Sequence, residues 1–120
     1  MSDSRRRTGR RGEDIAAHYF LQRDYTILHR NWRCPAGELD IVLQKDETII
    51  FVEVRTRTST RYGSPEESIT PAKQQRLIEL AHLYLQENSP PHRHWRIDVV
   101  AIAMQHGRPR VNHLENAVGW

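Results

Sequence analysis

The chain has 120 residues, a length that fits one domain with a single core. Lys and Arg number 18 against 15 Asp and Glu, so the formal net charge of +3 is compatible with a polyanionic partner such as nucleic acid. The single cysteine, Cys34, excludes an internal disulfide framework, and neither a membrane-spanning run of about 20 apolar residues nor a signal peptide is visible. We therefore expect a cytoplasmic protein that does not associate with membranes.

Residues 1–12 are strongly basic and carry no large apolar side chain after Met1. Such a segment cannot pack into a core, and we predict a flexible arm followed by a single folded domain over residues 13–118. The arm has two interpretations, a solvated tail that aids solubility or a segment that binds phosphates. In the second interpretation the contacts would come from its five arginines, Arg5, Arg6, Arg7, Arg10 and Arg11.

Apolar residues at helical spacing predict a first helix over residues 13–22, with Glu13 in its first turn, where the helix dipole favours an acid. Residues 25–32 are rich in β-branched and aromatic side chains and predict a short strand. The stretch GELDIVLQKDETIIFVEVRTR then predicts two strands, 38–44 and 48–56. So few residues separate these two strands that we expect an antiparallel hairpin.

A long polar loop that contains Gly and Pro follows over residues 57–68, and loops of this kind often carry function. The Thr-Pro pair at residues 70–71 is a helix start and predicts a second helix as far as Asn88. A nearly all-apolar segment predicts a buried strand over residues 95–104, and a short last strand follows around residues 111–114. The predicted order is therefore α-β-β-β-α-β with an extra strand at the end, which is a mixed α/β fold.

The register of the hairpin decides which of its side chains face one another. A two-residue turn at residues 46–47 places Asp40 opposite Glu53, and a four-residue loop keeps the same register. Glu38 then lies opposite Arg55, on the same face. A loop of three or five residues would instead place Asp40 and Glu53 on opposite faces. The face away from the acids carries apolar side chains: Leu39, Ile41, Leu43, Ile50, Val52 and Val54.

Two opposed carboxylates repel each other, and partial burial in a sheet raises the cost, so Asp40 and Glu53 need a positive charge between them. A divalent cation is one source of that charge, because Mg²⁺ prefers hard oxygen ligands such as carboxylates. Arg55 is the other source. The hairpin therefore predicts either a metal site or a cluster of acids bridged by Arg55.

Glu13, Asp40 and the tripeptide Glu53-Val54-Arg55 together resemble the signature of the PD-(D/E)XK nuclease superfamily. More specifically, the blocks GRRGEDIAAHYF, GELDIV, FVEVRTR and WRIDVVAI, in this order, resemble the YraN family of small bacterial proteins, which are similar to Holliday-junction resolvases. The resemblance covers residues 9–118 and implies a restriction-endonuclease-like core with a mixed central sheet flanked by helices. It also implies endonuclease-like hydrolysis of phosphodiester bonds with Mg²⁺ or Mn²⁺, on DNA, including branched DNA, in preference to RNA.

The same resemblance assigns roles to residues of this chain. Asp40 and Glu53 would bind the metal ion, with Glu13 as an additional ligand or water-binding acid, and Arg55 completes the catalytic set. Most members carry Lys at the position of Arg55, and a guanidinium can position water or clamp phosphate but cannot accept a proton. Two hypotheses follow, a metal-dependent nuclease or a non-catalytic nucleic-acid-binding module with the same fold. By analogy with resolvases, either would form a homodimer.

Further candidate contacts with nucleic acid lie outside the basic arm. Lys73 and Arg76 are neighbours on one face of the second predicted helix, and the resemblance implies that Lys73 lies near the site. Arg57 and Arg61 begin the long loop. Each of these basic groups has a second interpretation as an ordinary solvated surface.

Two other features are not expected to form functional sites. His92 and His94 have no Cys or His partner at zinc-binding spacing, so we expect no zinc site. Asp98 stands alone within the last long strand, and we predict a buried, paired structural acid.

Overall fold

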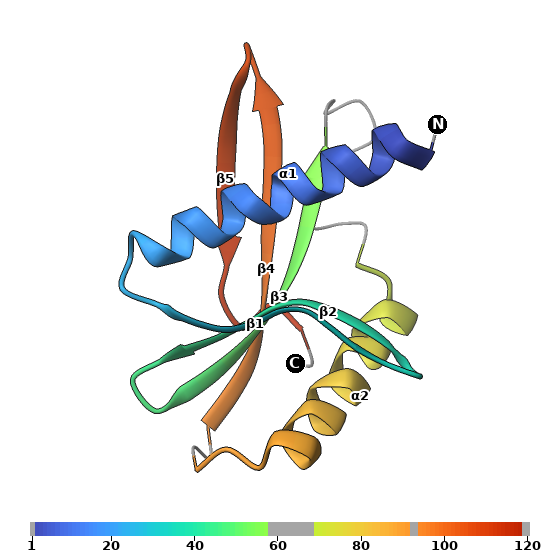
Figure 1. The fold of residues 1–120 in the computed structure, drawn as a ribbon, viewed down its shortest axis with the longest axis vertical. Coiled ribbons are helices and arrows are strands. Elements are labelled where there is room, and N and C mark those ends of the chain that lie inside the picture. Colours follow the sequence, from blue (N-terminus) through green and yellow to red (C-terminus); the bar gives the residue numbers. More distant parts are fainter. Residues whose placement is uncertain (1, 58–68, 92–93, 119–120) are drawn as a thin grey trace.

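The computed structural model describes residues 2–57, 69–91 and 94–118 (Figure 1). Its elements are, in chain order, α1 (Ser2–Leu21), β1 (Thr26–Cys34), β2 (Gly37–Lys45), β3 (Thr48–Arg57), α2 (Pro71–Asn88), β4 (His94–Gln105) and β5 (Arg108–Leu114). The predicted order of helices and strands, with the extra strand at the end, is confirmed. No helix in the described part of the chain is long and apolar enough to cross a membrane.

The five strands form one sheet in the order β1-β2-β3-β4-β5. β3 and β4 run parallel, and the other neighbouring pairs are antiparallel. Short turns suffice for antiparallel neighbours, whereas a parallel pair needs a crossover, and α2 lies in that crossover. The sheet is therefore mixed, as the sequence predicts.

Each face of the sheet carries its own apolar core, because side chains alternate between the two faces along each strand. One core lies against α2 and includes Val42, Phe51, Ile97, Val99, Leu77, Leu80 and Tyr84. The other lies against α1 and includes Ile41, Ile50, Val52, Val100, Ile102, Ala16 and Phe20. The two helices thus cover opposite faces of the sheet, and Figure 1 shows α1 crossing the strands at a distance from α2.

The first helix begins at Ser2, so the predicted start at residue 13 is wrong. Arginine is a good helix former, and the basic segment continues the helix toward the N-terminus. Gly12 is buried where this helix meets β3, and a β-carbon at that position would collide with the Thr56 hydroxyl. The glycine therefore lets the basic half of α1 lie close to the sheet.

The β2–β3 hairpin has the predicted register over the residues that pair. Lys45 pairs with Thr48, and the pairing continues as far as Ile41 with Val52. Leu39 departs from the prediction, because it packs in the core beside α2 and not on the opposite face. At Leu39, β2 pairs only with β1 among the described strands, and Leu39 lies opposite Trp32. The pairing with β3, from which the prediction was made, has already ended at Ile41.

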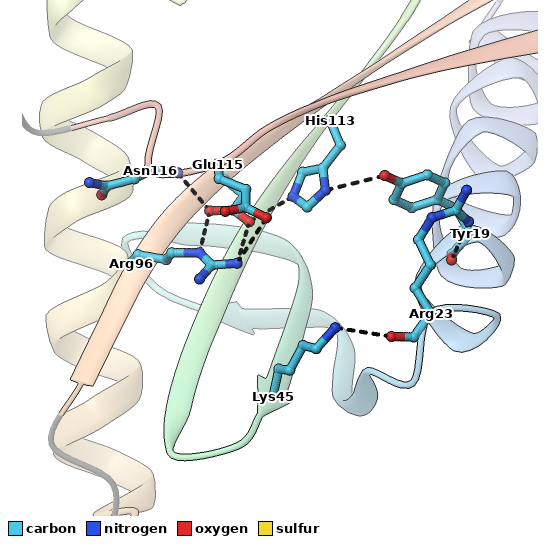
Figure 2. Close-up of polar contacts among 8 residues, drawn as sticks. Tyr19, Arg23, Lys45, Arg96, His113, Glu115 and Asn116 are labelled. Carbon is cyan, nitrogen blue, oxygen red and sulfur yellow. Dashed lines mark hydrogen bonds and ion pairs between the residues drawn. The ribbon is translucent and has the colours of Figure 1, made fainter.

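Asp98 is a buried structural acid, as predicted, and its side chain is 0% exposed. Its carboxylate accepts hydrogen bonds from Arg96 Nε (3.0 Å), His113 Nε2 (2.7 Å) and the Asn116 backbone N–H (2.9 Å). Figure 2 shows this network, in which the His113 ring also faces the Tyr19 hydroxyl of α1. Burial opposes ionisation, but the hydrogen bonds outweigh it and lower the pKa of Asp98.

Candidate active site

Asp40 and Glu53 lie where β2 and β3 separate. The last backbone pair of the hairpin joins Ile41 to Val52. Asp40 is the neighbour of Ile41 on β2, and Glu53 is the neighbour of Val52 on β3. Instead of a backbone pair, the Asp40 carboxylate accepts a hydrogen bond of 2.9 Å from the Val54 N–H through Oδ2. Asp40 and Glu53 therefore lie close together, as the sequence predicts, but in the fork where the two strands separate and not as an opposed pair within the ladder.

A pocket of about 270 Å³ opens at this fork, between the strands and α2. Its lining combines acids, bases and core side chains: Gly37, Glu38, Asp40, Glu53, Lys73, Arg76, Leu77 and Leu80. Lys73 and Arg76 reach it because α2 begins at a fixed point, where Thr70 Oγ1 accepts a hydrogen bond of 3.1 Å from the Lys73 N–H. The pocket therefore brings together four of the predicted site residues, two acids and two bases.

Glu53 is held by two cations. Lys73 Nζ lies 3.3 Å and Arg55 Nε lies 3.5 Å from the same carboxylate oxygen, Oε1, and the Glu53 side chain is only 8% exposed. Arg55 Nε is buried and has no hydrogen-bond partner in the described part of the chain. Arg55 thus forms an ion pair with Glu53 and not with Asp40, so it does not bridge the two acids. Lys73 supplies a second positive charge to Glu53.

Asp40 lies in an environment that disfavours its charge. Burial raises its pKa to about 7, and repulsion from Glu53, Glu13 and Glu38 adds to this effect, while the Val54 hydrogen bond opposes it. Among the described residues it accepts a neutral hydrogen bond and forms no ion pair. With a pKa of about 7, the Asp40 carboxyl is only partly ionised near neutral pH.

Glu13 approaches the same acids from α1. Its pKa is raised, first by burial and then by repulsion from Glu38. With its amide nitrogen turned toward the acids, Asn31 donates hydrogen bonds of 2.8 Å to Glu13 and 2.7 Å to Glu38. These three residues, with Gly9, Arg10 and Arg33, line a larger pocket of about 620 Å³.

The predicted opposition of Glu38 and Arg55 is wrong. Since the β2–β3 pairing ends before these residues, Glu38 instead pairs with Arg33 of β1, and Glu38 Oε2 lies 3.5 Å from Arg33 Nε. Asn31 and Arg33 were not among the predicted site residues. Asn31 has polar neighbours in the sequence, such as Arg30, and does not stand out among them, but the structure gives it a left-handed backbone with φ 55°. Nothing in the sequence singles out Arg33.

The remaining candidate contacts with nucleic acid are dispersed. Arg10 lines the larger pocket, Arg11 is exposed on α1, and Arg57 ends β3. Arg61 lies outside the described residues, as do the side chains of Arg5, Arg6 and Arg7. The structure therefore brings Arg10, Lys73 and Arg76 next to the acids and leaves Arg11 apart from both pockets.

The acids do not form a ready-made cage for a metal ion. Across residues 2–57, 69–91 and 94–118, no three His, Cys, Asp or Glu side chains are close enough together to hold one. Glu53 faces Lys73 and Arg55, and Glu13 is bonded to Asn31.

Comparison with known proteins places most of the chain in a single family. Residues 12–102 match the sequence model of the family described as "Uncharacterised protein family UPF0102". A UPF0102 protein of Syntrophomonas wolfei is 46% identical over 112 residues, which cover 93% of this chain and 97% of the relative. A UPF0102 protein of Chloroflexus aurantiacus is 46% identical over 121 residues, which cover 99% and 98%. The names of these relatives state no activity or ligand.

Proposed function

The chain belongs to the UPF0102 (YraN) family, and we propose that it binds nucleic acid and hydrolyses phosphodiester bonds, on DNA, with Mg²⁺ or Mn²⁺. The observation that carries this proposal is the position of Asp40 beside Glu53 at the fork between β2 and β3. The order of elements and the mixed sheet support the restriction-endonuclease-like core that the sequence resemblance implies.

The chemistry of the donor groups fits a hard divalent cation. Asp40 has a raised pKa because it is buried near other acids, and a bound cation would remove that repulsion. Asp40 and Glu53 would hold the ion, with Glu13 as a third candidate ligand. A bound Mg²⁺ or Mn²⁺ would supply Lewis-acid polarisation of the phosphodiester and a more acidic water.

The bases of the pocket have complementary roles in this proposal. The guanidinium of Arg55, whose Nε forms no hydrogen bond with the described residues, is a suitable partner for a phosphate oxygen. Lys73 holds Glu53 through an ammonium group, which, unlike Arg55, can lose a proton to become a base. Arg76 adds positive charge at the mouth of the same pocket. Together these side chains favour an anion beside the acids.

A second function, a non-catalytic nucleic-acid-binding module, is favoured by one specific observation. Glu53 already has two cationic partners, Lys73 and Arg55, so it needs no metal ion for its own charge. In that case the site would bind phosphates through its bases, and the acids would only orient them. Binding would then be independent of divalent metal.

A cleavage assay separates the two functions. The purified full chain is incubated with single-stranded, linear duplex and four-way-junction DNA, with Mg²⁺, with Mn²⁺ or with EDTA. The nuclease proposal predicts cleavage that requires the metal and is lost in Asp40→Asn, while the control Asp46→Asn, on the exposed turn of the same hairpin, cleaves normally. Binding without cleavage under any of these conditions would support the non-catalytic module.

A further inference from the structure

We infer that the two pockets beside Glu38 form one groove that takes a single strand of nucleic acid. For convenience we call the larger pocket, next to α1, the α1 pocket, and the smaller one, next to α2, the α2 pocket. The inference deepens the proposed function by naming its substrate class, and it rests on that function only for the choice of nucleic acid as partner.

The two pockets meet at one residue. Glu38 lines both the α1 pocket and the α2 pocket. Asn31 bonds Glu38 on the α1 side, and Asp40 follows Glu38 along β2 on the α2 side. A ligand that filled one pocket could therefore continue into the other past the start of β2.

The path changes from one face of the sheet to the other. The α1 pocket is lined by Arg10 and Glu13 of the first helix, whereas the α2 pocket is lined by Lys73 and Leu77 of the second. These helices cover opposite faces of the sheet. The crossing occurs at Glu38, where β2 no longer pairs with β3.

Each pocket combines positive charge with acids. Arg10 and Arg33 stand in the α1 pocket, and Lys73 and Arg76 stand in the α2 pocket. The Arg33 side chain is 77% exposed and is thus available to a ligand. A chain of phosphates that occupied both pockets would meet bases in each of them, which fits a strand that passes from one pocket into the other.

A single strand suits this path better than a duplex. DNA duplex is stiff over about 150 base pairs and cannot bend around the end of one strand of a sheet, whereas a single strand rotates freely about its backbone. The larger pocket, of about 620 Å³, lies within the range of small-molecule sites, about 300–1,000 Å³, and the smaller one, of about 270 Å³, lies just below that range. Such volumes admit a few nucleotides of one strand.

The test measures binding without cleavage. The full chain is titrated, in EDTA, into fluorescently labelled DNA of about 12 nucleotides, as a single strand and as the matched duplex, at several salt concentrations. We expect the single strand to bind about 10-fold more tightly than the duplex. Arg33→Gln and Arg76→Gln should each weaken single-strand binding by about 3- to 10-fold and lower the salt slope by about 0.7.

Arg108→Gln is the matched control, because Arg108 is exposed on β5, at the other edge of the sheet from β1. It should bind like the unchanged protein, and a thermal melt of each variant checks that it is folded. Equal or tighter binding of the duplex would overturn the inference, and so would an effect of Arg76→Gln without one of Arg33→Gln. Preference for single strands without any metal-dependent cleavage would support the groove and contradict the proposed nuclease function. A failure of the groove can therefore be told apart from a failure of the proposed function.

Discussion

The Asp40 carboxylate accepts a hydrogen bond of 2.9 Å from the Val54 backbone N–H, so a side chain of β2 is tied to the backbone of β3 just where the two strands separate. This bond fixes Asp40 beside Glu53 although the backbone ladder has ended. It also keeps the carboxylate in a buried, acidic environment that disfavours its charge. The separation of the two strands thus explains both where the Asp40 carboxylate lies and why its ionised form is disfavoured.

Replacing Asp40 should stabilise the metal-free protein above neutral pH. The pKa of Asp40 is raised from 3.8 to about 7 in the folded state, so folding becomes less favourable as the pH rises between these values. Asp40→Asn removes this penalty and still offers an oxygen to the Val54 N–H. We expect it to increase the free energy of unfolding at about pH 8 by on the order of 1–4 kcal/mol, with little difference below about pH 4. Urea denaturation at both pH values measures this difference.

The matched control is Asp46→Asn, which removes the same charge from the exposed turn of the same hairpin. It should change the free energy of unfolding by less than about 0.5 kcal/mol at either pH. If Asp40→Asn destabilised the protein at the higher pH, the charge on Asp40 would have to be compensated by a partner, and the argument for a missing cation would fail.

Divalent metal should raise the melting temperature in a pH-dependent way. A cation binds the ionised carboxylate, so protons compete with it, and affinity should fall as the pH drops through the Asp40 pKa of about 7. We expect Mn²⁺ affinity to decrease by up to about 10-fold per pH unit below that value. Thermal melts with increasing Mn²⁺ at a series of pH values measure it, and a shift that persisted unchanged in Asp40→Asn would place the metal elsewhere.

Arg55→Lys should increase cleavage. Both side chains can pair with Glu53, but an ammonium can exchange a proton with water at accessible pH and a guanidinium cannot. Because acid–base catalysis typically contributes about 10²–10⁴-fold, we expect the metal-dependent cleavage rate to rise by about 10-fold or more. The control is Arg110→Lys on β5, which makes the same exchange at an exposed position. No gain over that control would mean that Lys73 already supplies the proton transfer or that none is needed.

Asp98→Ala should destabilise the fold strongly without touching the site. It leaves Arg96 and His113 without their buried acceptor, and breaking a buried ion pair typically costs about 3–5 kcal/mol. Asp14→Ala is the matched control, since Asp14 Oδ1 also accepts from an arginine, Arg30 (2.6 Å), but is 66% exposed and should cost less than about 1 kcal/mol. Chemical denaturation of both variants compares them. Equal costs would show that the Asp98 network is not a structural element of the core.

Short-range rules in the sequence were enough for the strands, the second helix and the hairpin. A two-residue turn fixes a register, and the register carries the pairing as far as Ile41 and Val52, the neighbours of Asp40 and Glu53. The start of α1 was not predictable in the same way, since the arginine-rich segment has helix propensity but no apolar face to reveal its packing. Its contact with the sheet depends on Gly12 fitting against Thr56, which is a long-range relationship.

The site was predictable where it depends on one hairpin and not where three elements meet. Lys73 contacts Glu53 from α2, which follows β3 along the chain. Only the resemblance to a known family indicated that these two residues are close. Arg33 and Asn31 join the acids because β2 leaves β3 to pair with β1 alone, and no local pattern signals where a ladder ends. The same separation made the predicted Glu38–Arg55 pair wrong.

Anomalous scattering from a crystal soaked in Mn²⁺ tests the central claim most directly. The account predicts a peak between the carboxylates of Asp40 and Glu53, with Lys73 displaced from Glu53, and no peak in crystals of Asp40→Asn. A structure at saturating Mn²⁺ in which Lys73 and Arg55 still hold Glu53, with no peak at Asp40, would contradict it.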